Sequence, residues 1–262
     1  MVEVYIKERL IQKLRQIKRR GWILGARQGN VGSIGNTLED FLGIKENNLP
    51  IPNAAEWELK CQRAETSSLT TLFHMEPSPR ALKFVPNILL LKYGWKHKEA
   101  GSKYPPNEMS FRQTISCGIR SDRGFKVVVD HKSRKVLISF DAKTVSPRHK
   151  KWRESVKRHV GLVELNPQPY WGFDDLFHKA GTKLLNCFFV KAEVKQMASK
   201  ECFKYTDIKM LQKFSLERFI SAIERGLIYV DFDARTGHNH GTKFRMKQDK
   251  LPELYEVVTD IY

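Results

Sequence analysis

Residues 184–194 constrain the fold more than any other segment of the chain. This segment combines aromatic, β-branched and other apolar residues around the run Cys187-Phe188-Phe189-Val190. It is far shorter than the roughly 18 apolar residues that a membrane-spanning helix needs. Such a composition predicts a central β-strand that is buried on both faces of a sheet. The chain must therefore supply further strands beside it and other elements to cover it.

Helical and strand patterns both occur in the rest of the chain. Apolar residues recur at helical spacing in the first 30 residues (Ile6, Leu10, Leu14 and Ile17) and predict an amphipathic helix. Further helices are predicted over residues 33–42, 173–182 and 211–225, with Gly226 ending the last. Strands are predicted over residues 56–61, 69–74, 125–130, 135–140, 227–233 and 243–247, with a loop at 234–241. The mixture predicts an α/β fold.

The chain carries a large surplus of positive charge. Among its 262 residues, 46 Lys and Arg oppose 29 Asp and Glu, which gives a formal net charge of +17 at pH 7. Basic residues concentrate in residues 1–30 and 143–158. Hydrophobic residues make up 41% of the chain, too many for a disordered polycation. The surplus favours a polyanion as partner, foremost nucleic acid, although each basic block could also be a solvated face.

No sequence feature predicts export or a membrane partner. Residues 1–20 lack the apolar stretch and the small-residue cleavage site of a signal peptide. The four cysteines (Cys61, Cys117, Cys187 and Cys202) form no CxxC pair, which argues against a disulfide framework or a zinc site. We therefore expect a cytoplasmic protein.

A possible catalytic set lies near the N-terminus. Alternate side chains of a strand share a face, so Glu56, Glu58 and Lys60 should point the same way. A further carboxylate, Glu39, lies on the preceding helix. Carboxylate oxygens suit Mg²⁺, which retains waters and a substrate phosphate oxygen. An adjacent Lys can orient the water or stabilise the charged phosphate. The alternative is an exposed face of a sheet, which explains a Glu-x-Lys pair equally well.

At these residues the chain resembles the MvaI/BcnI family of type II restriction endonucleases. This family is related to the mismatch-repair nicking enzyme MutH within the PD-(D/E)-x-K nuclease superfamily. The matching segments are Leu38-Glu39 with Gly43 and Glu46-Asn47-Asn48, Glu56-Trp57-Glu58-Leu59-Lys60, Ser68–His74, Tyr170–Asp174 and His238–Arg245. They follow one another in order across nearly the whole chain, so the resemblance is much more specific than Glu58-x-Lys60 alone.

The resemblance implies a fold and a function. The fold would be a PD-(D/E)-x-K nuclease core, a mixed central sheet flanked by helices, with two lobes around a DNA cleft. Residues 1–165 would form mainly the catalytic lobe, and residues 166–262 mainly the recognition lobe. The partner would be double-stranded DNA, cut by a monomer at a short G·C-rich site with Mg²⁺. A cognate DNA methyltransferase would be the genetic partner.

The resemblance also assigns roles to individual residues. Position 53 and Glu58 would hold Mg²⁺, Lys60 would assist the water, and Glu39 would support the site. The residues expected to bind DNA are His74, Asp231, His238, His240, Lys243 and Arg245. Arg can bond guanine O6 and N7, and a carboxylate can accept from cytosine N4. Alternatively, Asp231 and Asp233 form ion pairs with Arg235 or Arg245, and His238 and His240 belong to a metal site.

Position 53 departs from the family pattern. Where the family has a metal-binding Asp, this chain has Asn53, whose amide oxygen carries no charge and should hold Mg²⁺ more weakly. Three explanations are open: a deliberately inactivated Asp-to-Asn form, a naturally impaired homologue, or replacement of the carboxylate by Glu56. We favour the first. Two rival functions are a MutH-like nicking endonuclease and a non-catalytic DNA-binding protein on a decayed nuclease core.

Overall fold

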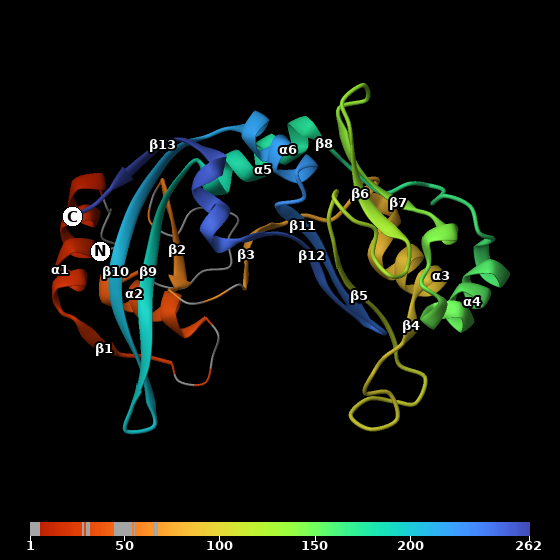
Figure 1. Ribbon diagram of the computed structural model, residues 1–262, viewed down its shortest axis with the longest axis horizontal. Coiled ribbons are helices and arrows are strands. Elements are labelled where there is room, and N and C mark those ends of the chain that lie inside the picture. Colours follow the sequence, from red (N-terminus) through yellow and green to blue (C-terminus); the bar gives the residue numbers. More distant parts are fainter. Residues whose placement is uncertain are drawn as a thin grey trace. The chain divides into compact units, whose positions relative to one another are not determined.

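The computed structural model describes residues 6–27, 29, 32–44, 54, 56–64, 66 and 68–262. It is a mixed α/β structure, as predicted, and its strands form three sheets (Figure 1). The chain divides into two compact units. Unit 1 comprises Met1–Ser68, Ala180–Ser215 and Gln248–Tyr262, and unit 2 comprises Leu69–Lys179 and Leu216–Lys247. The sequence-based boundary at residue 165 lies within unit 2. None of the described helices is long and apolar enough to cross a membrane.

Unit 1 is built on a five-stranded sheet. Its strands are β1 (Trp22–Leu24), β2 (Trp57–Arg63), β9 (Asn186–Met197), β10 (Lys200–Phe214) and β13 (Tyr255–Asp260). The order is β1-β10-β9-β2, and β13 also pairs with β10. β2 runs parallel to β9, whereas the other pairs are antiparallel. The predicted central strand is confirmed, because β9 has a partner on each side and residues 187–190 are buried.

Two helices cover this sheet. α1 (Lys7–Arg19) buries Leu10, Leu14 and Ile17, the residues whose spacing predicted an amphipathic helix. α2 (Ser33–Leu42) buries Ile34, Leu38 and Leu42, and these apolar side chains share one core with those of β2, β9 and β10. α2 ends at Gly43, whose φ of +73° is a left-handed conformation that glycine adopts without a Cβ penalty. The shared core packs α2 against β2, the strand that carries the predicted catalytic pair.

Unit 2 contains the other two sheets. One has the order β3-β12-β11-β5-β4, and the other β6-β7-β8. The strands are β3 (Leu69–His74), β4 (Trp95–Lys96), β5 (Met109–Ile115), β6 (Phe125–Asp130), β7 (Lys135–Phe140), β8 (Tyr170–Gly172), β11 (Ile228–Arg235) and β12 (His238–Lys247). The predicted hairpin of residues 125–140 is confirmed by the pairing of β6 with β7.

The remaining helices are mostly short. They are a π-helix at Val85–Leu90, α3 (Leu91–Tyr93), α4 (Lys150–Val160), α5 (Phe173–Leu184), α6 (Leu216–Glu224), and 3₁₀ turns at Arg80–Leu82, Ala142–Thr144, Pro147–His149 and Gln248–Leu254. α5 begins in unit 2 and ends in unit 1.

Two sequence-based element assignments were wrong in part. The predicted helix of residues 211–225 starts only at Leu216, because residues 211–214 are the end of β10 and pair with β9 and β13. The predicted loop of residues 234–241 shrinks to Thr236-Gly237, since β11 extends to Arg235 and β12 begins at His238. At residues 211–214, pairing with strands distant in sequence overrides the local pattern, whereas residues 234–241 are drawn into the hairpin of β11 with its neighbour β12.

Candidate active site and nucleic-acid interface

Glu58 and Lys60 occupy adjacent positions on one face of β2. In the parallel ladder with β9, Glu58 lies opposite Cys187 and Lys60 opposite Phe189. Trp57 points to the other face, where it is 1% exposed and its ring centroid lies 4.6 Å from that of Phe188. This packing fixes the direction of the strand and therefore the direction of both charged side chains.

Glu58 is a buried carboxylate that faces two ammonium groups. Its side chain is 2% exposed, and Oε1 lies 2.7 Å from Lys60 Nζ. Lys183 Nζ, from the last turn of α5, lies 3.6 Å from Oε2. The exposed-sheet alternative is therefore wrong for Glu58 and Lys60. Glu56, in contrast, precedes β2 and is exposed.

The charges of these residues are coupled. Burial by itself would lower the pKa of Lys60, but the ion pair with Glu58 and the nearby charge of Glu39 outweigh burial and raise it. Glu39 also contributes to the raised pKa of Cys61, although burial of that thiol is the larger cause. The structure thus brings together three of the predicted catalytic residues: Lys60 contacts the buried carboxylate of Glu58, and Glu39 is near enough to act on the charge of Lys60.

Neutral groups surround the carboxylate of Glu58 on the β9 side. Burial, and then the charge of Glu58, raise the pKa of the Cys187 thiol far above neutrality. Burial raises the pKa of the Tyr255 hydroxyl in the same way, and the charges of Cys187 and Glu58 act in the same direction. Both groups are therefore protonated at pH 7, which leaves the carboxylates and lysines as the charged groups of the site.

The described donor set suits a hard divalent cation, but only in part. Glu58 Oε2 is buried and, within the described part of the chain, has no hydrogen-bond partner. A carboxylate oxygen of this kind is a ligand that Mg²⁺ prefers. No cluster of three or more His, Cys, Asp or Glu side chains that could hold a metal occurs among the described residues. Asn53 and residues 46–48 lie outside them.

A second group of predicted residues gathers on one sheet face of unit 2. Along β11, Ile228, Val230, Phe232 and Ala234 are buried, whereas the residues between them are half-buried. Across four strands, His74 pairs with Lys243, Lys243 with Asp231, and Asp231 with Thr114. We name this surface the charged sheet face; its residues are His74, Arg112, Thr114, Asp231, Asp233, Lys243 and Arg245.

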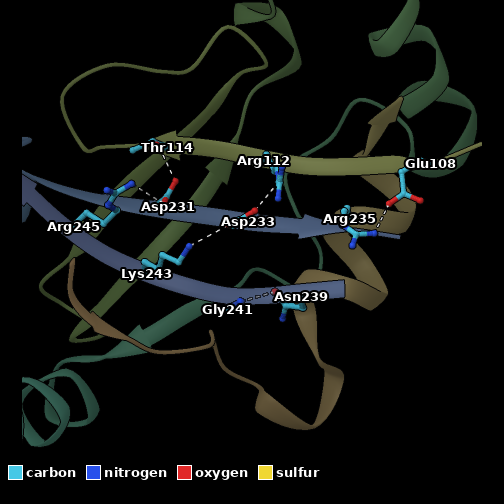
Figure 2. Close-up of polar contacts among 10 residues, drawn as sticks. All are labelled: Glu108, Arg112, Thr114, Asp231, Asp233, Arg235, Asn239, Gly241, Lys243 and Arg245. Carbon is cyan, nitrogen blue, oxygen red and sulfur yellow. Dashed lines mark hydrogen bonds and ion pairs between the residues drawn. The ribbon is translucent and has the colours of Figure 1, made fainter. Parts of the chain in front are cut away.

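Ion pairs connect the strands of the charged sheet face, as Figure 2 shows. Asp231 accepts a hydrogen bond from Thr114 Oγ1 at 2.7 Å and lies 3.3 Å from Arg245 Nη1. The predicted alternative of an Asp231–Arg245 pair is therefore confirmed. Asp233 pairs instead with Arg112, at 2.6 Å, and with Lys243, at 3.2 Å. Arg235 pairs with Glu108 at 3.0 Å.

Asp233 is held in its charged form by these neighbours. Partial burial would raise its pKa, but the hydrogen bond and charge of Lys243, with the charges of Arg112 and His240, outweigh burial and lower it. Asp233 thus has cations on both neighbouring strands, and Asp231 has one on β12, so the face can approach a polyanion without net repulsion.

The two histidines at the tip of β12 are exposed. The rings of His238 and His240 are stacked, with centroids 6.5 Å apart and planes 13° apart. Because no third metal ligand accompanies them among the described side chains, the geometry gives no support to a metal pair. Glu76 holds this segment by accepting hydrogen bonds from Thr242 N at 2.8 Å and Asn239 Nδ2 at 3.4 Å.

Sequence reasoning missed four residues that take part in these two sites. Lys183 follows a predicted helix and Arg112 and Thr114 lie in an unpredicted strand, so nothing local connects them with Glu58 or with Asp231. Glu76 comes two residues after the predicted strand 69–74. The only signal in the sequence was the charged or polar residue type, because each contact spans more than 100 residues of sequence.

Comparisons with known proteins place this geometry in a family. The sequence model of the MvaI/BcnI restriction endonuclease family matches residues 11–255. The fold is similar to that of restriction endonuclease MvaI in a complex with its cognate DNA substrate, at 24% identity and a TM-score of 0.76, covering 98% of this chain and 100% of that one. For MvaI without DNA the identity is 22% and the TM-score 0.56, with 100% of both chains covered. No curated protein sequence matched. The extent of the family match shows that the chain belongs to the MvaI/BcnI restriction endonuclease family.

Proposed function

We propose that the chain is a Mg²⁺-dependent, site-specific deoxyribonuclease that hydrolyses duplex DNA at a short G·C-rich site. The observation that carries this proposal is the buried carboxylate of Glu58, paired with Lys60, in a member of a restriction endonuclease family. Burying a carboxylate whose Oε2 has no hydrogen-bond partner among the described residues is costly for stability, which suggests that Glu58 serves a function. Metal-assisted phosphodiester hydrolysis supplies one.

Unit 1 would perform the hydrolysis. Glu58 and the residue at position 53 would hold Mg²⁺, which when bound stabilises developing negative charge and lowers the pKa of a water. Lys60 keeps its ammonium beside the carboxylate, where it would orient the attacking water or stabilise the charged phosphate. Glu39 would support the charge balance of Lys60. In-line attack would leave a 5′-phosphate and a 3′-hydroxyl.

Unit 2 would read the bases. Arg245 and Lys243 carry donors suited to guanine O6 and N7, and Asp231 an acceptor suited to cytosine N4. His74, His238 and His240 lie on the same sheet or at the tip of its hairpin, and we propose that they also contact DNA. We add Arg112 and Thr114 to this set, because Arg112 pairs with Asp233 and Thr114 donates a hydrogen bond to Asp231.

We further propose that Asn53 replaces a catalytic Asp and that the present chain binds DNA far better than it cuts it. The enzyme would act as a monomer in the cytoplasm, with a cognate methyltransferase protecting host DNA. Asn53 also favours a second candidate, a DNA-binding protein whose nuclease activity has decayed, because an uncharged ligand weakens the metal site.

The deciding experiment incubates plasmid DNA with the present chain and with its Asn53→Asp variant, with and without Mg²⁺. We expect discrete fragments only from the variant and only with Mg²⁺. Equal cleavage by both forms would contradict the role of position 53. Specific binding without cleavage by either form would favour the decayed nuclease, and nicks that require a partner protein would favour a MutH-like enzyme.

A further inference from the structure

The buried carboxylate of Glu58 has two lysines, and they come from different elements. Lys60 lies two residues along the same strand and contacts Oε1 at 2.7 Å. Lys183 lies on α5, more than 120 residues away, and its ammonium faces Oε2 at 3.6 Å. Its side chain is 21% exposed, so it reaches the buried oxygen from the rim of the site.

Lys183 faces Oε2 of Glu58, the carboxylate oxygen that a bound cation would use. Oε1 already accepts the short contact from Lys60, whereas Oε2 has no hydrogen-bond partner within the described ranges. A metal ion ligated by Oε2 would stand close to the ammonium of Lys183, and like charges at such separations repel strongly in a partly buried site. Lys carries its charge on a flexible four-carbon chain and can therefore withdraw.

We propose that Lys183 is a positioning residue whose ammonium competes with the divalent cation for Glu58 Oε2. This proposal rests on the metal role of Glu58 in the proposed function. Without metal, the Lys183 ammonium serves as the counter-ion of Oε2 and keeps the buried carboxylate neutralised. Metal binding requires this ammonium to leave Oε2. Lys183 therefore lowers the affinity of the site for divalent cations.

The test measures Mn²⁺ binding without DNA, by electron paramagnetic resonance of the free ion. It compares the parent chain with Lys183→Gln, Lys183→Arg and Lys204→Gln. Lys204 is the matched control, because its Nζ lies 3.6 Å from Glu193 Oε2 in the same unit, but both partners are half-exposed. All four are also measured with Asn53→Asp, in which binding is expected to be stronger.

We expect Lys183→Gln to bind Mn²⁺ at least about threefold more tightly, a gain of roughly 0.7 kcal/mol, whereas Lys183→Arg and Lys204→Gln stay near the parent. A larger Mn²⁺-induced rise in Tm for Lys183→Gln would support the same conclusion. If the parent binds Mn²⁺ and Lys183→Gln binds it equally or more weakly, the competition is refuted but the metal site stands. If no form binds Mn²⁺, including those with Asn53→Asp, both proposals fail.

Discussion

At the level of single residues, Glu58 depends on its cations. A buried ion pair that loses one partner leaves an uncompensated charge, which costs about 3–5 kcal/mol. Lys60→Met should therefore lower the free energy of unfolding. We expect a loss of at least about 2 kcal/mol, somewhat less than the full cost, because Lys183 still faces the other oxygen of Glu58. Urea unfolding measures this loss. The double variant Glu58→Gln/Lys60→Met should regain most of the stability, and equal stability of the two variants would contradict this account.

Asp233 should make stability depend on pH. Its pKa is lowered in the folded protein, so its contribution is present above the unfolded pKa of about 3.9 and is lost as the pH falls through the folded value. Asp233→Asn should therefore destabilise the protein more at pH 7 than at about pH 3, where the carboxyl of the unfolded chain is already mostly protonated. Chemical unfolding at both values tests this. The control is Asp174→Asn, an 89% exposed partner of Arg134 that should have little effect at either pH. A loss that is the same at both pH values would contradict the prediction.

At the level of elements, the β11–β12 hairpin depends on Glu76. This carboxylate accepts hydrogen bonds from the backbone and side chain of the buried residue Thr242, next to the His238–His240 tip. Glu76→Ala would leave the Thr242 N–H without its acceptor, and we expect a loss of about 1–3 kcal/mol. It should also reduce the preference for cognate over unrelated duplex DNA. Both effects can be measured, by urea unfolding and by fluorescence anisotropy.

A control for this prediction is Glu224→Ala. Glu224 also belongs to unit 2, but its partner His131 is 64% exposed and the pair lies on the surface. It should change unfolding by less than about 1 kcal/mol and leave DNA discrimination unchanged. If Glu76→Ala behaved in the same way, the hairpin would not depend on this carboxylate.

Elements with a local signal could be predicted from the sequence. The helix at residues 7–19 is indicated by its apolar spacing, and the hairpin at 125–140 by its polar turn. β10 was not predicted. No strand was expected over residues 200–210, and residues 211–214 were assigned to a helix, yet pairing with β9 and β13 decides their conformation. Segment 234–241, with two Gly and two His, was assigned to a loop, but the hairpin turns within Thr236-Gly237.

The candidate sites could also be predicted only where the signal is local. Glu58 and Lys60 could be paired from the period of a strand, and Glu39 could be recognised as a carboxylate on the preceding predicted helix. Lys183 could not be found, because its contact depends on where α5 ends relative to β2. Arg112 could not be found either, since β5 meets β11 only through the antiparallel register that sets Arg112 opposite Asp233.

At the level of the whole molecule, the net charge of +17 predicts strong salt dependence of DNA binding. The groove lined by Lys150, Lys151, Glu154 and Arg158 lies in the predicted basic block, on the exposed side of α4. Replacing its three basic residues by Gln should reduce the slope of log K against log salt by about 1 for each phosphate that the groove then fails to neutralise. Binding titrations between about 50 and 200 mM salt measure the slope.

The matched control removes the same charge from unit 1, as Lys195→Gln, Lys200→Gln and Lys204→Gln on β9 and β10. If the α4 groove binds phosphates, its triple variant should show a shallower slope than the control. Equal slopes would mean that overall charge, and not this groove, sets the salt dependence.

The alternation of the chain between the two units has a consequence for how such an enzyme can change its target in evolution. The chain first enters unit 2 at β3 and finally leaves it at the end of β12. These two strands are paired, with Leu69 opposite Lys247. Between them the chain returns to unit 1 for residues 180–215. A recombination event with a single crossover, for example at residue 165, would bring together β7 and β8 from different parents, although they pair in one sheet. Point substitutions on the charged sheet face disturb no such pairing. With the base-reading role proposed for this face, a lineage with this topology would acquire new target sequences residue by residue and not by the exchange of gene segments.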